Sequence, residues 1–249
     1  VEVIGRCHRL VDELVAQHPG VAAHREAQAR GYLNHGNVLF DLNRHAEALE
    51  EFARAERVFN QLVYGFPRDK TLVGNQAQVH HNRADLLFAA KQMPQAETSF
   101  RQAIAIREKL LAELPALHLQ RSALTVSYQK LCDLLHQSGK LPEAAEPARK
   151  ALGHLEKLPS DGEWTIIVLT QSAVFENLLG MLAFARNDYG HAEPHVRRAW
   201  QNNERLHKLQ PDNASFRKNL VFATNNYELL MRVLGNYAEQ SKTLDRALE

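Results

Sequence analysis

The sequence has few cysteines and almost no net charge, and each shortage excludes a class of protein. Cys7 and Cys132 are its only cysteines. Two thiols so far apart form neither a disulfide framework nor a cysteine-based zinc motif, and we expect both to be buried as small apolar side chains. The 30 basic and 29 acidic residues leave a formal net charge of +1. This balance gives no electrostatic attraction for a nucleic acid or an anionic membrane.

The sequence also lacks a signal peptide and a lipidation motif, and only one stretch is long and apolar enough to cross a bilayer. This stretch, residues 164–185, reads WTIIVLTQSAVFENLLGMLAFA. Gln171, Glu176 and Asn177 lie at or beyond its middle, where polar groups are costly in a membrane. We interpret it as a core helix packed on two sides and expect no membrane insertion. Free thiols and neutral charge favour the cytoplasm, but flanking sequence could carry an anchor.

Motifs of catalysis and metal binding are missing as well. There is no G-x-S-x-G sequence, no glycine-rich phosphate loop and no catalytic pair of carboxylates. His191 and His195 lie four residues apart, a spacing that can share an ion. Their segment, HAEPH, lacks both the glutamate placement of the zinc-protease motif and a third ligand. We therefore expect a protein that is not an enzyme and has no metal site and no cofactor.

What the sequence does contain is a repeat of 48 residues. One column of the repeat holds proline in four places and a second holds alanine in four: Pro19, Pro67, Pro115, Pro211; Ala48, Ala96, Ala144, Ala192. A further column has only small residues: Cys7, Ala55, Ala103, Ala151, Ala199 and Ala247. Each unit reads as two amphipathic helices with a helix-ending residue between them, at Asn43, Lys91, Gly139, Asn187 and Gly235.

The small columns predict close packing within each helical pair. Alanine lets two helices approach, and the matching small positions on the first helices are Gly36, Ala84, Cys132 and Gly180. The prolines end the second helices. Where proline is missing, at Glu163, the sequence SDGE (160–163) predicts a capping box.

Two motifs carry a family resemblance. Asn34, Gly36 and Leu39 in N-x-G-x-x-L, followed by Glu47 to Ala55 in E-A-x-x-x-F-x-x-A, resemble the tetratricopeptide repeat. The long period is similar to that of kinesin light chains and of arrays attached to bacterial serine/threonine kinases. The resemblance implies an all-α, right-handed α–α superhelical solenoid. We expect a single array over 1–249: a second helix of a truncated repeat at 1–18, repeats at 19–66, 67–114, 115–162 and 163–210, and a truncated repeat at 211–249.

The resemblance also implies a function, a non-catalytic scaffold that binds a peptide or protein segment in a concave groove lined by the first helices. The expected groove residues are Asn34, Asn37, His81, Asn82, Asp85, Gln129, Lys130, Asp133, Asn177, Asn225 and Asn226. Asparagine offers both a donor and an acceptor to a peptide backbone. The same side chains could instead bond neighbouring helices or water. The lysine of a chaperone-binding carboxylate clamp is absent. The alternative function is a regulatory or sensor module of a larger bacterial signalling protein, with a kinase domain in cis.

Overall fold

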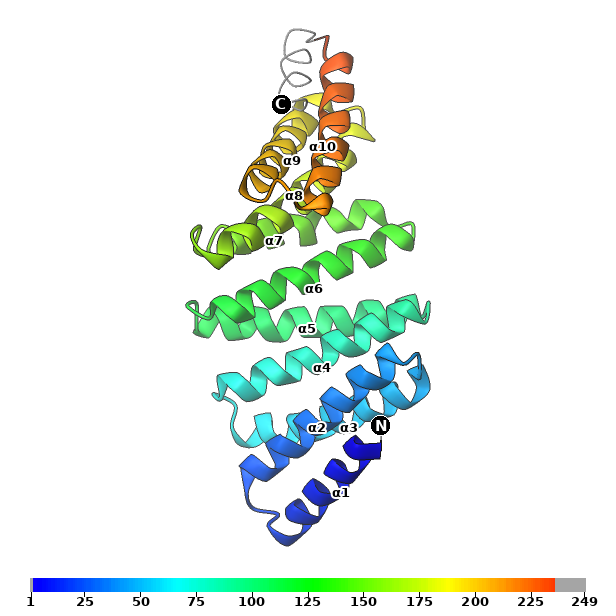
Figure 1. Cartoon of the computed structure of the whole chain (residues 1–249), viewed down its shortest axis with the longest axis vertical. Coiled ribbons are helices and arrows are strands. Elements are labelled where there is room, and N and C mark those ends of the chain that lie inside the picture. Colours follow the sequence, from blue (N-terminus) through cyan, green and yellow to red (C-terminus); the bar gives the residue numbers. More distant parts are fainter. Residues whose placement is uncertain (1, 236–249) are drawn as a thin grey trace. The chain divides into compact units, whose positions relative to one another are not determined.

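The computed structural model describes residues 2–235, and every regular element in that part of the chain is a helix (Figure 1). The predicted all-α class is confirmed. The chain divides into two compact units, which meet at Gln120 and Arg121. The first unit consists of α1 (Glu2–Gln17), α2 (Ala22–Asp41), α3 (His45–Gly65), α4 (Lys70–Ala89) and α5 (Met93–Glu113), together with the first turn of α6.

The second unit contains the rest of α6 (His118–Gln137), the short 3₁₀ helix η1 (Leu141–Ala144), α7 (Ala145–Leu155), α8 (Glu163–Phe184), α9 (Tyr189–Leu209) and α10 (Ala214–Val233). Helices that follow one another along the chain pack together most extensively in the pairs α2–α3, α4–α5, α8–α9 and α9–α10. The predicted second helix of the last repeat, within 236–249, lies outside the described residues. The exact repeat boundaries stay a prediction.

The residues that end the first helices have the backbone conformation that the sequence predicts. Asn43, Lys91, Gly139, Asn187 and Gly235 all have φ between 58° and 72°. The residue after each of the first four donates its amide to a carbonyl five residues back, for example Arg44 N to Leu39 O at 2.8 Å. This bond satisfies a carbonyl that the helix end leaves free. The prediction of left-handed turns is confirmed. Lys91 is the one of the five that is neither Gly nor Asn, so its Cβ makes the left-handed conformation energetically unfavourable.

The proline column also acts as predicted. Helices α1, α3, α5 and α9 end at Gln17, Gly65, Glu113 and Leu209, and each end lies two residues before a proline of the column. A residue that precedes proline is disfavoured in the helical region, so the helix stops there. In all four cases the next helix starts five residues after that end, and Asp69 and Asn213 cap the starts of α4 and α10 with their side chains. The 48-residue period of the sequence therefore corresponds to the regular spacing of the ends of the second helices.

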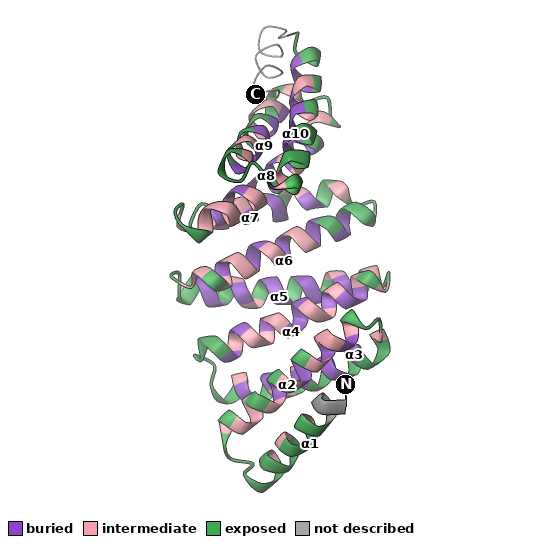
Figure 2. Cartoon of the chain, in the orientation of Figure 1, coloured by how far each residue is buried: buried purple, intermediate pink, exposed green. Residues whose placement is uncertain are grey.

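The small columns lie in the buried interior of the helical pairs, where buried residues of facing helices meet (Figure 2). Ala48, Ala96, Ala144 and Ala192 are all completely buried. A Cβ added to Gly36 would lie 2.5 Å from the ring of Phe52, and one added to Gly180 would lie 2.6 Å from Cγ2 of Val196. Both distances are too short for real carbon contacts. The predicted close packing of small residues is confirmed.

Two local predictions are wrong. The SDGE segment forms no capping box, because the N-cap of α8 is Gly162, which has no side chain to cap the helix. The backbone carbonyl of Ser160 instead accepts a hydrogen bond from the hydroxyl of Thr165, at 3.1 Å. Gly162 has φ of 56°, so the chain enters α8 through a conformation that a serine cap does not use. Cys7 is exposed, and only Cys132 is buried as expected.

Helix α8 contains the long apolar stretch. Within residues 2–235 it is the one helix that is long and apolar enough to cross a membrane, judged by length and composition alone, and 39% of that stretch is buried in this structure. It packs against both α7 and α9. Its polar residue Glu176 is buried, with ion pairs to His195 of 2.5 Å and to Arg198 of 3.2 Å. These pairs compensate the cost of burying the carboxylate.

Candidate functional site

A chain of amide side chains links the first helices of the first unit. Arg107 of α5 is 1% exposed and donates from Nη2 to Oε1 of Gln78 on α4, at 2.8 Å. Gln78 donates from Nε2 to Oδ1 of Asn82 at 2.5 Å, and Asn82 donates from Nδ2 to Oδ1 of Asn37 on α2 at 2.7 Å. The predicted groove residues Asn37 and Asn82 are thus brought together across two neighbouring repeats.

The buried arginine fixes the direction of this chain. A guanidinium has only donors, so Gln78 must turn its oxygen toward Arg107 and its NH₂ group toward Asn82. Asn82 then presents its oxygen to Gln78 and its NH₂ group to Asn37. The NH₂ group of Asn37 is left over, and within the described residues it donates no hydrogen bond. Burial lowers the pKa of Arg107 to about 10, which still leaves it charged at neutral pH.

The second unit has a corresponding pair of amides. Asn226 of α10 donates from Nδ2 to Oδ1 of Asn177 on α8, at 2.9 Å. Among the described residues, the NH₂ group of Asn177 donates only to the sulfur of Met181, at 3.5 Å, which is a weak acceptor. Asn82 and Asn226, which the repeat period aligns, therefore each donate to an asparagine on the preceding first helix, as in the alternative that the sequence left open.

Two hollows lie on either side of the Asn177–Asn226 pair. Each has a volume of about 210 Å³, and Asn177 lines both. The first hollow is lined by Asn226 and by the apolar groups Gly180, Met181, Phe184, Ala185, Val196 and Leu229. The second includes Val174, Asn203, Asn219 and Phe222. We call this region the α8–α10 surface.

The α8–α10 surface exposes large apolar side chains. Met181 is 42% exposed, Leu229 49% and Phe222 55%. Exposed apolar groups that gather around a hollow are typical of sites that receive an apolar part of a ligand.

The other predicted groove residues differ in their surroundings. Asn34, Asp133 and Asn225 are exposed, and Gln129 and Lys130 are half-buried. His81 is buried; its ring lies 5.6 Å from that of Phe100, and its Nε2 lies 3.5 Å from a carboxylate oxygen of Asp85. His81 is therefore part of the packing between α4 and α5. Whether these positions bind a ligand stays a prediction.

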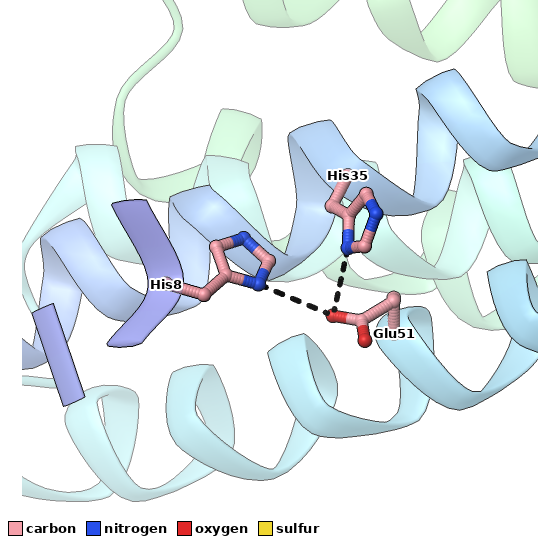
Figure 3. Close-up of side chains that lie close together, drawn as sticks. All are labelled: His8, His35 and Glu51. Carbon is pink, nitrogen blue, oxygen red and sulfur yellow. Dashed lines mark ion pairs between the residues drawn. The ribbon is translucent and has the colours of Figure 1, made fainter. Parts of the chain in front are cut away.

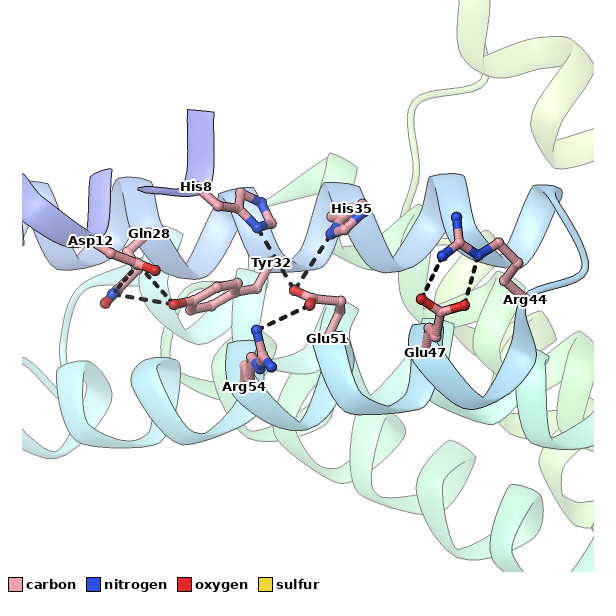
Figure 4. A network of polar contacts seen from close by, with 9 residues as sticks. All are labelled: His8, Asp12, Gln28, Tyr32, His35, Arg44, Glu47, Glu51 and Arg54. Carbon is pink, nitrogen blue, oxygen red and sulfur yellow. Dashed lines mark hydrogen bonds and ion pairs between the residues drawn. The ribbon is translucent and has the colours of Figure 1, made fainter. Parts of the chain in front are cut away.

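A second polar cluster in the first unit was not predicted (Figure 4). It joins α1, α2 and α3 through His8, His35 and Glu51, with Nδ1 of the two histidines 4.0 and 3.7 Å from Oε2 of Glu51. Arg54 contacts the other carboxylate oxygen at 3.3 Å. Burial is the main cause that lowers the pKa of His35, against the opposing effect of Glu51. We call these three residues the His–His–Glu cluster.

A tyrosine on α2 borders this cluster. The hydroxyl of Tyr32 donates to Asp12 of α1 at 2.8 Å, and the same carboxylate oxygen accepts from Gln28 at 2.8 Å. Burial first, then the bond to Asp12, raises the pKa of Tyr32 to about 12. Its hydroxyl therefore remains a donor over the physiological pH range, and it holds α1 against α2.

The two histidines singled out by spacing do not share a site. His191 turns to Asp188, with Nδ1 2.8 Å from a carboxylate oxygen, at the N-terminus of α9. His195 turns to Glu176 on α8. Another histidine, His80, is buried near the ion pair of Glu56 and Arg83. Burial lowers its pKa, Glu56 opposes this shift and Arg83 adds to it.

Comparison with protein families identifies the repeats. Residues 29–61 and residues 78–113 each match a family model described as tetratricopeptide repeat. Both matches start in a first helix and end in the second helix of the same pair. The chain contains tetratricopeptide repeats. No curated protein sequence matches this tetratricopeptide repeat protein.

Solved structures share the fold of the tetratricopeptide repeat chain at low sequence identity. BtubC (BKLC) from P. vanneervenii has 18% identity and a TM-score of 0.65, over 99% of this chain and 87% of its own. A putative kinesin light chain of Podospora anserina, described by nearly identical TPR-like repeats, has 15% identity and a TM-score of 0.53, over 89% and 93%. YrrB, described as a TPR protein with an unusual peptide-binding site, has 13% identity and a TM-score of 0.52, over 96% and 90%. The predicted helical-repeat fold is confirmed.

Proposed function

We propose that this tetratricopeptide repeat protein is a non-catalytic scaffold that binds an extended peptide segment of a partner along its first helices. The observation that carries the proposal is the polarised amide chain that ends at the NH₂ group of Asn37. An amide held in one orientation offers a donor to a peptide carbonyl without first reorienting. YrrB, which has the same fold, is described as having a peptide-binding site.

The α8–α10 surface supports the same function with a different chemistry. Its hollows expose Met181, Leu229 and Phe222 around the amide pair of Asn177 and Asn226. Such a surface suits a peptide whose backbone bonds to the amides while an apolar side chain enters a hollow. We therefore expect the preferred segments to be extended and to carry at least one large apolar residue. A regulatory module with a kinase domain in cis, and a cytoplasmic location, stay predictions that the flanking sequence would test.

The test uses peptides selected against the wild-type chain from a random display library. The variant Asn37→Asp keeps the oxygen that accepts from Asn82 and removes the NH₂ group that is offered to the peptide. We expect it to weaken the binding of peptides that dock on the first unit by about fivefold or more, since one hydrogen bond contributes about 1 kcal/mol. Binding is measured by fluorescence anisotropy with labelled peptides.

The matched control is Asn60→Asp. Asn60 lies exposed on the second helix α3 and also accepts an inter-helix amide bond, from Gln76 at 2.7 Å. The Asn60→Asp variant should leave the affinity for the peptides unchanged. Leu229→Ser tests the apolar hollow in the second unit in the same way. If every selected peptide binds Asn37→Asp and Leu229→Ser as tightly as the wild type, the first helices are not the binding surface.

A further inference from the structure

The same position in successive repeats holds a different pair of side chains. It lies between the second helix of one repeat and the first helix of the next. At 48-residue steps from His8 and His35, the following pair is Glu56 and Arg83, an ion pair of 2.9 Å. Four steps from the first pair are Trp200 and Tyr227, whose rings stack with centroids 5.4 Å apart. In these two positions each side chain has a complementary partner.

The first position differs because its two side chains do not form a complementary pair: neither an ion pair with each other nor a ring stack. His8 and His35 bring two imidazole rings to a single carboxylate, that of Glu51 (Figure 3). The side chains are 15%, 13% and 10% exposed. Within residues 2–235, four buried atoms have no hydrogen-bond partner: Nε2 of His8, both ring nitrogens of His35 and Oε2 of Glu51. Buried polar atoms without partners are costly, so this position calls for a further group.

The distances between these atoms suit an ion better than hydrogen bonds. Contacts of 3.7 and 4.0 Å are too long for hydrogen bonds. One potential ligand atom from each of the three residues lies within 4.8 Å of the others. Around a tetrahedral Zn²⁺ with bonds of about 2.0–2.1 Å, ligand atoms lie roughly 3.3 Å apart. The side chains therefore need only a small inward movement to reach a common ion.

The surroundings also fit a metal site. Arg54 holds Oε1 of Glu51 at 3.3 Å and leaves Oε2 facing the histidines, which orients the carboxylate as outer-shell partners of metal ligands do. Arg54 also lines a hollow of about 290 Å³ together with Tyr32, next to the cluster. Two imidazoles and a carboxylate form a ligand set used by divalent transition metals, Zn²⁺ among them.

We propose that His8, His35 and Glu51 form a binding site for a divalent transition metal ion, with Zn²⁺ the first candidate and water as the fourth ligand. The ion joins three helices, with one ligand from each of α1, α2 and α3. Its role is structural, because it fixes the preceding second helix onto the hairpin that follows. The proposal is independent of peptide binding.

The test is a titration of the full chain, first treated with EDTA, with Zn²⁺ against a chromophoric chelator. We expect one ion per chain and a higher midpoint of thermal unfolding when Zn²⁺ is present. His8→Gln, His35→Gln and Glu51→Gln should each lower the affinity by at least 10- to 100-fold, the range that even outer-shell changes cost. Co²⁺ in place of Zn²⁺ should give the strong visible absorption of four-coordinate cobalt in the wild type, and these variants should lose it.

The matched control is His191→Gln, which removes a histidine that is exposed and paired with Asp188. It should keep the affinity and the cobalt spectrum of the wild type. Far-UV circular dichroism checks that each variant folds, and the near-isosteric Glu51→Gln preserves packing if a histidine variant does not. Less than one Zn²⁺ per wild-type chain, or an affinity retained within tenfold in Glu51→Gln, overturns the proposal.

Discussion

The contact between Gly36 and Phe52 allows a test of the close packing within a repeat by a double-mutant cycle. In Gly36→Ala the new Cβ would lie 2.5 and 2.6 Å from two ring carbons of Phe52. Carbon atoms in contact lie about 3.5–4.0 Å apart, so the ring would have to move by about 1 Å. Phe52 is fully buried, so this movement would press its ring against the packed interior.

The magnitude follows from two opposing effects. Overpacking of this kind costs about 1–3 kcal/mol, and replacing glycine by alanine inside a helix returns about 1 kcal/mol. Gly36→Ala should therefore lower the free energy of unfolding by about 1 kcal/mol. In the Phe52→Ala background the ring is absent, and the same substitution should stabilise the chain by about 1 kcal/mol. The coupling between the two positions is then about 2 kcal/mol.

The assay is urea unfolding followed by far-UV circular dichroism, with comparison of m values to check that the transition has not changed in kind. Gly153→Ala is the control, because Gly153 lies in α7 and an added Cβ would meet no atom within 4 Å. It should stabilise the chain by about 0.5–1 kcal/mol. An equal effect of Gly36→Ala with and without the ring of Phe52 would refute the argument that small residues set the distance between the helices.

Three further predictions concern single residues. Lys91→Gly should raise the free energy of unfolding by about 1 kcal/mol because glycine has no Cβ penalty at φ of 62°, whereas Lys91→Ala should give no such gain. Stability should fall as the pH drops below 6.5, because the buried His80 has a lowered pKa and the unfolded chain takes up its proton first. Urea unfolding at several pH values should show a smaller fall in His80→Gln than in the wild type. Burial raises the pKa of Cys132 to about 12, so iodoacetamide at neutral pH should modify Cys7 alone in the folded chain, and both thiols in urea, as read by mass spectrometry.

The sequence predicts the helical pairs because their determinants are local or periodic. A left-handed residue at Asn43 or Gly139 and a proline two residues past a helix end act within one turn of the chain. Alanine at Ala48 recurs at a fixed step, so its burial in every repeat can be inferred once the period is found. The predicted capping box does not form because Gly162 adopts a positive φ and takes the N-cap position of α8. Ser160 therefore lies outside the helix start and does not cap it.

The polar clusters could be predicted only in part. The asparagine columns were visible, but the link from Arg107 through Gln78 depends on two residues outside those columns and on the burial of a charged group. The His–His–Glu cluster has no motif, because its members lie on three helices at irregular separations. The signal that could have found it is the repeat itself: in the first repeat, histidines occupy positions that hold apolar or ion-paired residues in the others.

The different side-chain pairs between repeats have a consequence for how the array assembles. A carboxylate and a guanidinium in one position, and two stacked aromatic rings in another, mean that the repeats are not interchangeable units. A hairpin docked one repeat out of place would set the charge of Glu56 against an apolar or aromatic surface. These two junctions thus favour their own neighbours, and part of the order of the repeats is specified by their contacts as well as by the chain.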